Sequence, residues 1–136
     1  MREFLSDVAW GSLDLLLVDL PPGTDGVTDL YDLVPSLAGI IAVTIPSDEA
    51  RRSVARSLRA ARDADVPILG VIENMSGYRC PGCASVQPLF DGAAGQALAD
   101  EFGVPLLGRL PFCPHGDGPG QEALASTVQA VLGRAS

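Results

Sequence analysis

Four runs of apolar residues, rich in Val, Ile and Leu, dominate the hydrophobic pattern of the chain. None of them alternates apolar with polar positions, and a continuous apolar run is typical of a strand buried on both faces. Strands of this kind belong to parallel sheets that helices cover. The pattern therefore predicts strands over residues 13–20, 40–45, 67–72 and 106–110.

Helical patterns fill the intervals between these runs. Ser47 is a suitable N-cap, and its helix is expected to continue to about Ala64, with Asp48 and Glu49 in the first turn, where they suit the helix dipole. A weaker helix is expected over residues 28–36. Two further helical stripes consist of Phe90, Ala93, Ala94, Ala97, Leu98 and Phe102, and of Leu124, Val128, Val131 and Leu132. Strands that alternate with helices predict a doubly wound α/β domain with a mostly parallel sheet.

Composition narrows the possible functions. The chain has 136 residues, which suits a single domain over residues 1–136, and 47% of them are hydrophobic. Its net charge of −8 argues against binding the phosphate backbone of a nucleic acid. The apolar runs are too short to cross a membrane, and the first residues lack the apolar core of a signal peptide. We therefore expect a cytoplasmic protein without nucleic-acid or membrane partners.

Basic residues gather on one predicted helix. Arginine accounts for all nine basic residues of the chain, which has no lysine. Five of these arginines fall on one face of the helix that starts at Ser47, opposite its apolar positions. This face is either solvated or a docking surface for an acidic partner. Its members are Arg51, Arg52, Arg56, Arg59 and Arg62.

One carboxylate stands at the end of an apolar run. Asp19 closes the run 13–20 and is followed by Pro21, Pro22 and Gly23. An acid at the carboxyl end of a buried parallel strand points into the crevice where α/β proteins bind ligands, and it could hold a magnesium ion through water. Gly23 would let the loop approach a phosphate. The alternative is an aspartate that caps the following turn.

Two cysteines three residues apart suggest metal chemistry. Cys80 and Cys83 lie in a Gly- and Pro-rich loop over residues 75–90, not at the entry to a helix, which argues against a thioredoxin-type redox pair. A closed tetrahedral site needs four ligands. A second copy of the chain could complete it, or Cys113 and His115 could join the pair in a zinc site. The two cysteines could also be inert.

A third polar residue follows a buried run. Asn74 comes directly after the run 67–72 and Glu73, and its amide could read the edge of a nucleotide base. An asparagine that closes a turn is the simpler interpretation. His115 is the single histidine and lies between Pro and Gly, so the sequence supports no catalytic triad.

Several segments occur in an order that resembles one family over residues 3–120. The chain is similar to the Mrp/ApbC family, iron–sulfur cluster carrier ATPases of the deviant Walker A class that are related to MinD. The segments that carry the resemblance are Trp10-Gly-x-Leu-Asp14, Asp19-Leu-Pro-Pro-Gly-Thr24, Val66-Pro-Ile-Leu-Gly-Val-Ile-Glu-Asn-Met-Ser76, Cys80-Pro-x-Cys83 and Phe102-Gly-Val-Pro-Leu-Leu-Gly-x-Leu-Pro111.

The resemblance implies a cytosolic homodimer. Such a scaffold holds a bridging 4Fe–4S cluster and passes it to apo-proteins, with ATP binding and hydrolysis gating the transfer. The resemblance assigns six residues by position: Cys80 and Cys83 as cluster ligands, Asp19 as the magnesium-side acid, Gly23 as the switch glycine, Asn74 as the reader of adenine and Pro111 as part of the loop against the base.

The chain departs from the resembled family in several places. It lacks the Gly-x-x-x-x-Gly-Lys-Ser/Thr loop, and it reads Asp25-Gly26 where the family usually has Gly-Asp. Phe112-Cys113 follows Pro111, where an acid two residues after the proline is common. The chain therefore resembles the C-terminal half of a P-loop NTPase domain. Without the loop and its lysine, autonomous ATP hydrolysis is not expected, and ATP with magnesium would bind only if a partner supplied that loop.

The missing half has a consequence for the sheet. In the resembled family, the loop-bearing strand lies between the strands that correspond to residues 13–20 and 40–45. Without it these two strands either pair directly or leave an open apolar slot, and open strand edges promote association. We expect the chain to pair with itself or with a separate N-terminal half. Three functions remain open: a cluster carrier, a subunit of a split ATPase, and a zinc-stabilised interaction domain.

Overall fold

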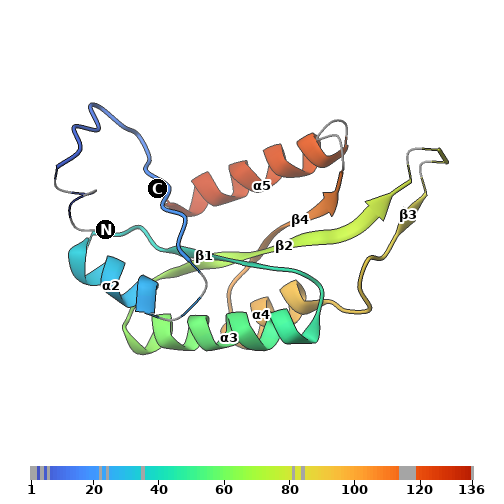
Figure 1. Cartoon of the computed structure of the whole chain (residues 1–136), viewed down its shortest axis with the longest axis horizontal. Helices are drawn as coiled ribbons and strands as arrows, with labels where there is room; N and C mark the ends of the chain where they lie inside the picture. The colour runs from blue at the N-terminus through green and yellow to red at the C-terminus, as the bar shows by residue number, and fades with distance from the viewer. Residues whose placement is uncertain are drawn as a thin grey trace.

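The computed structural model describes residues 3, 5, 7–21, 23, 25–34, 36–80, 82–83, 85–113 and 119–135. Helices α2, α3 and α4 lie on one face of a sheet and α5 lies on the other (Figure 1). The fold is therefore α/β, as predicted. No described helix is long and apolar enough to cross a membrane. The elements are α2 (Asp25–Leu33), β1 (Ile40–Thr44), α3 (Asp48–Asp63), β2 (Ile68–Arg79), β3 (Val86–Gln87), α4 (Ala94–Phe102), β4 (Leu106–Phe112) and α5 (Pro119–Ala135).

Strand β2 organises the sheet. It pairs in parallel with β1 on one side, where Ala42 lies opposite Val71, and with β4 on the other, where Val71 lies opposite Leu106. The C-terminal end of β2 forms one arm of a hairpin, in which it pairs antiparallel with β3. Among the described residues, β1 pairs with β2 alone, so one edge of β1 has no strand beside it.

The main core lies between the sheet and helices α3 and α4. Leu58 of α3, Val71 of β2 and Leu98 of α4 are its largest fully buried side chains. Helix α3 begins as the sequence predicts, because the Ser47 hydroxyl accepts a hydrogen bond from the Ala50 amide at 3.2 Å. This face of the sheet is the well-packed one.

Three arginines of α3 contact α4. Arg51 and Arg59 both form ion pairs with Glu101. Arg62 donates a hydrogen bond to the Phe102 carbonyl at 2.7 Å, and its guanidinium lies 4.7 Å from the centre of the Phe102 ring. Much of the predicted arginine face is thus engaged within the chain and joins two helices.

The prediction of a buried strand over residues 13–20 is wrong. This segment belongs to no strand, and Leu17 is 73% exposed. It crosses over β1 instead of running alongside it (Figure 1). A strand needs a neighbour for its backbone hydrogen bonds, and this segment pairs with no strand among the described residues.

The last helix is where the sequence predicts it, but its apolar stripe is not buried. Leu124, Val128 and Leu132 are exposed, whereas Thr127 is almost fully buried. Helix α5 approaches β4 so closely that a Cβ placed on Gly108 would overlap the Thr127 side chain. The side of α5 that carries Thr127 therefore faces the sheet. The side that carries the apolar stripe faces away from it.

Candidate functional site

The Cys80–Cys83 pair lies at the tip of a hairpin. Strands β2 and β3 form its arms, and the Cys80 amide donates a hydrogen bond to the Ser85 carbonyl at 2.9 Å across the tip. The hairpin extends past the end of the sheet (Figure 1). Both thiols are free, with Cys80 half-buried and Cys83 exposed. The structure thus presents two thiols where a second macromolecule can reach them.

The environment of Cys83 favours its thiolate. The Ser85 hydroxyl lies 3.0 Å from the Cys83 sulfur. Hydrogen bonds from this hydroxyl, from the Ser85 backbone and from the Cys80 side chain lower the pKa of the Cys83 thiol below its ordinary value. A thiolate is the form that binds metals, so this arrangement prepares Cys83 as a ligand.

Replacing Ser85 with alanine is expected to slow alkylation of Cys83. The hydroxyl stabilises the thiolate, so its loss raises the pKa of Cys83 and shifts the pH–rate profile to higher pH. We expect a decrease of roughly two- to threefold in the iodoacetamide rate at neutral pH, since one hydrogen bond is lost. Peptide mass spectrometry assigns the rate to Cys83, and Ser53→Ala serves as control. Equal rates in both variants would contradict the role of Ser85.

The third cysteine does not join this pair. Cys113 follows β4, and a Cβ placed on Gly120 at the start of α5 would lie 2.9 Å from the Cys113 sulfur. Within the described part of the chain, no three His, Cys, Asp or Glu side chains are grouped to hold a metal ion. His115 lies outside the described residues. The structure therefore offers a two-thiol site and gives no support to the zinc site with Cys113.

Asn74 and Pro111 come together on neighbouring strands. Asn74 of β2 lies opposite Leu110 of β4, so Pro111 is the next residue on the adjacent strand. The Asn74 side-chain oxygen accepts a hydrogen bond from the Met75 amide at 2.8 Å, and Met75 has a φ of +54°. Asn74 thus lies within β2 beside an irregularity of the strand, and not at the turn that the simpler interpretation expected.

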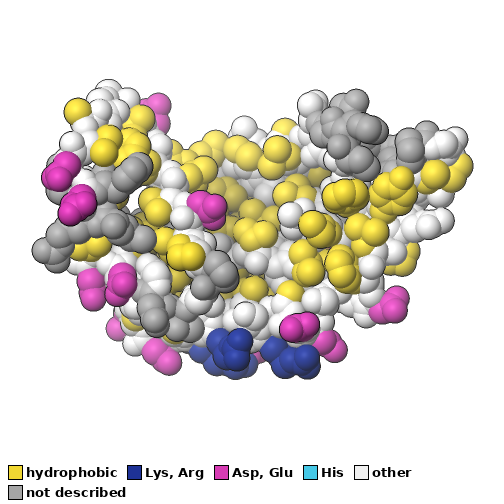
Figure 2. All heavy atoms as spheres, in the orientation of Figure 1, with side chains coloured by type: hydrophobic (Ala, Val, Ile, Leu, Met, Phe, Trp, Pro, Cys, Tyr) yellow, Lys and Arg dark blue, Asp and Glu magenta, His cyan; other side chains and the backbone are white. Residues whose placement is uncertain are grey.

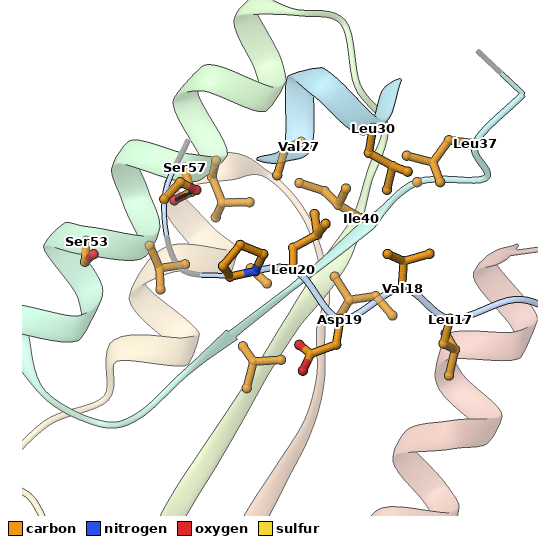
Figure 3. Close-up of a pocket in the computed structure, with 18 of the residues that line it drawn as sticks. Leu17, Val18, Asp19, Leu20, Val27, Leu30, Leu37, Ile40, Ser53 and Ser57 are labelled. Atoms are coloured by element: carbon orange, nitrogen blue, oxygen red, sulfur yellow. Dashed lines mark hydrogen bonds between the residues drawn. The ribbon is translucent and has the colours of Figure 1, made fainter. Parts of the chain in front are cut away.

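Asp19 and Gly23 lie elsewhere, on the wall of an open hollow. The hollow has a volume of ≈ 520 Å³ and lies between residues 16–21 and 23, α2, α3 and β1 (Figure 3). Asp19 is exposed and is not at the carboxyl end of a strand, so its expected position was wrong. The Ser57 hydroxyl donates a hydrogen bond to the Gly23 carbonyl at 3.2 Å, and Gly23 has a φ of +142°, which favours glycine.

Sequence reasoning missed a buried carboxylate beside Asn74. Glu73 is 3% exposed, and its carboxylate accepts hydrogen bonds from the Gly95 amide at 2.7 Å and from Arg109 Nε at 3.3 Å. It thereby ties the start of α4 and strand β4 to β2. A single charge inside an apolar run was the signal that could have revealed it.

A comparison with models of protein families shows to which family the chain is related. The model described as NUBPL iron-transfer P-loop NTPase (ParA) matches residues 1–130. The chain belongs to this family. The NUBPL family membership agrees with the order of motifs and with the α/β fold.

Relatives in the NUBPL family are much longer than this chain. An iron-sulfur cluster carrier protein of Methanocaldococcus jannaschii is 45% identical over 133 residues, which cover 97% of this chain and 44% of the relative. The cytosolic Fe-S cluster assembly factor CFD1 of Saccharomyces cerevisiae is 42% identical over 117 residues, covering 84% of this chain and 40% of that protein. The chain thus spans less than half the length of these curated relatives.

A solved structure shares the fold. A nucleotide-binding protein from Archaeoglobus fulgidus, determined in complex with ADP, superposes with a TM-score of 0.66 at 28% sequence identity. The match covers 96% of this chain and 51% of the other. The described elements therefore correspond to about half of that protein.

Proposed function

We propose that this chain carries an iron–sulfur cluster on the hairpin tip that bears Cys80 and Cys83. The observation that supports this proposal most directly is the pair of free thiols at the hairpin tip. One of them, Cys83, is exposed and has a lowered thiol pKa. Thiolates are the usual ligands of iron–sulfur clusters. Relatives named as cluster carrier and assembly proteins support this assignment.

The cluster would be a 4Fe–4S cluster shared by two chains. A 4Fe–4S cluster takes four cysteine ligands, and one tip supplies two. Two tips that meet would complete the set without any other element of the fold. Transfer to an apo-protein is a ligand exchange, in which client thiolates replace Cys80 and Cys83 on iron and no electron moves. The name of the yeast relative supports a cytoplasmic setting.

The nucleotide-site residues form only part of a site. Asp19 and Gly23 would serve the magnesium and phosphate side, and Asn74 and Pro111 the base side. Since the sequence has no lysine and no phosphate-binding loop, we propose that the chain alone does not hydrolyse ATP.

Anaerobic reconstitution of the chain with ferrous iron and sulfide tests this function. We expect a brown iron–sulfur chromophore, about two iron and two sulfide per chain, and a dimer by native mass spectrometry, since four ligands come from two tips. Reconstitution with zinc provides the comparison. One zinc per monomer with no iron–sulfur chromophore would contradict the proposal and favour an interaction domain.

A further inference from the structure

We propose that Glu73 is a positioning residue for the hairpin that bears Cys80 and Cys83, because it joins the two ends of this hairpin where they meet the sheet. This role rests on the proposed function, which places the cluster ligands on the hairpin. The chain leaves the sheet along β2, to which Glu73 belongs. It returns from β3 to α4 through residues 88–93, called the return segment below, which form neither a helix nor a strand.

The outer part of the hairpin is exposed. The hairpin extends past the end of the sheet (Figure 1), and Figure 2 shows hydrophobic side chains at the surface in this part of the molecule. Val86 of β3 is 68% exposed, and Leu89 of the return segment is 43% exposed. The direction in which the hairpin points therefore depends on how its two ends are held at the sheet.

The outgoing strand contains an irregularity between the sheet and the cysteines. The register of β2 against β4 shifts between Asn74 and Tyr78. Met75, within this stretch, has a φ of +54°, which is uncommon for a residue other than glycine. An irregularity of this kind disrupts the ladder of hydrogen bonds and bends the strand. Pairing with β4 alone therefore does not fix the direction of the hairpin.

Glu73 holds the end of the return segment. This segment leads into α4, whose N-cap residue Ala93 makes no side-chain capping hydrogen bond and whose first turn has no acidic residue. The first amides of a helix need acceptors from outside the helix. The Glu73 carboxylate supplies one, because it accepts a hydrogen bond from the Gly95 amide at 2.7 Å, although the two residues are 22 positions apart. This contact closes the part of the chain that carries both thiols.

The surroundings of this contact leave it little freedom. A Cβ placed on Gly95 would lie 2.7 Å from the Glu73 Cβ, so the glycine allows α4 to approach β2 closely. A Cβ placed on Gly92 of the return segment would lie 2.7 Å from the Pro46 carbonyl oxygen. Arg109 Nε donates a hydrogen bond to the second carboxylate oxygen of Glu73 at 3.3 Å. Since Glu73 is 3% exposed, water does not compete for these bonds.

A distance measurement without iron tests the inference. Nitroxide labels are attached to Cys83 at the tip and to Ser53→Cys, an exposed position on α3, in a full chain that also carries Cys80→Ser and Cys113→Ser. Pulsed electron paramagnetic resonance then gives the distribution of distances between the labels. Glu73→Leu fills similar space but accepts no hydrogen bond, so we expect it to widen this distribution at least about twofold.

Two control variants separate positioning from a loss of stability. Glu73→Gln keeps an oxygen that accepts the bond from the Gly95 amide, and Arg109 stays solvated because it is 51% exposed. Leu98→Ala weakens the packing of α4 but removes no atom of the contact. We expect both controls to keep the narrow distribution of the labelled parent chain. An equally narrow distribution in Glu73→Leu, or an equally wide one in either control, would overturn the inference.

A second readout links the position of the hairpin to the cluster. The same substitutions are made in the chain with its three cysteines, which is reconstituted with iron and sulfide and then exposed to a ferrous chelator. We expect Glu73→Leu to lose its cluster roughly tenfold faster than the unmodified chain, since ligands that are not held in place release metal more readily. Glu73→Gln and Leu98→Ala should lose it at the unchanged rate. Glu73→Met provides a second variant, and circular dichroism verifies the fold of each.

The two readouts distinguish this inference from the proposed function. A widened distribution in Glu73→Leu together with an unchanged rate of cluster loss would overturn the role of Glu73 in holding the ligands. Absence of a cluster from every chain, the unmodified one included, would refute the proposed function. The label distances would still decide whether Glu73 positions the hairpin, because they are measured without iron.

Discussion

Replacing either Cys80 or Cys83 with serine is expected to reduce bound iron and the cluster chromophore to background. Each tip supplies two of the four ligands, so a dimer of either variant retains only two thiolates. Cys83 is exposed and Cys80 half-buried, so the fold should persist in both variants. Iron analysis and visible absorption after anaerobic reconstitution measure the effect, and circular dichroism verifies the fold.

Cys113→Ser is the matched control for both variants. Its sulfur lies against the start of α5 at Gly120 and joins no three-ligand group within the described residues. We expect this variant to retain as much iron as the unmodified chain. Loss of iron in Cys113→Ser alone would show that the third thiol is a ligand and would refute the two-thiol hairpin site.

Leu98→Ala is expected to lower the free energy of unfolding by roughly 2–5 kcal/mol. Leu98 of α4 is 0% exposed and belongs to the core cluster with Leu58 and Val71. Shortening it removes buried methyl groups and leaves a cavity that the surrounding helices fill only in part. A whole domain is stable by about 5–15 kcal/mol, so this loss is a large share. Urea denaturation followed by circular dichroism measures it.

Leu124→Ala makes the same chemical change at an exposed position. Leu124 is 51% exposed on α5, so its truncation should cost less than about 1 kcal/mol in the isolated chain. Similar losses in the two variants would mean that α5 is packed as tightly as α4, contrary to the exposure of its apolar stripe.

Local patterns predicted most elements correctly. The strands over β1 and β4, the cap at Ser47 and helix α3 follow from hydrophobic runs and capping residues. Helix α2 begins at Asp25 and ends at Leu33, three residues earlier than the stretch expected over 28–36. The two-residue strand β3 was not predicted, because it exists only through its pairing with the end of β2. The hairpin that presents the cysteines is thus a product of pairing.

The sequence likewise predicted some features of the candidate site and not others. The cysteine pair was predicted from its spacing. The structure places it at the tip of a hairpin, because parts of the loop expected over residues 75–90 belong to strands β2 and β3. The roles of Asp19, Gly23, Asn74 and Pro111 stay predictions. The lowered thiol pKa of Cys83 could not be predicted from spacing, since it depends on how the tip folds Ser85 back onto the sulfur.

The sequence by itself determined the family, the α/β class, the lack of a lysine-bearing loop and the thiol pair, because each depends on residue identity and short-range order. Only the tertiary structure decided what the run 13–20 does. Its apolar composition is that of a buried strand, but a strand forms only where a neighbour satisfies its backbone. The tertiary structure also decided that the apolar stripe of α5 faces away from the sheet. The opposite side of the helix faces β4, where the buried Thr127 packs against Gly108. Burial and pairing depend on neighbours in space, which no local pattern contains.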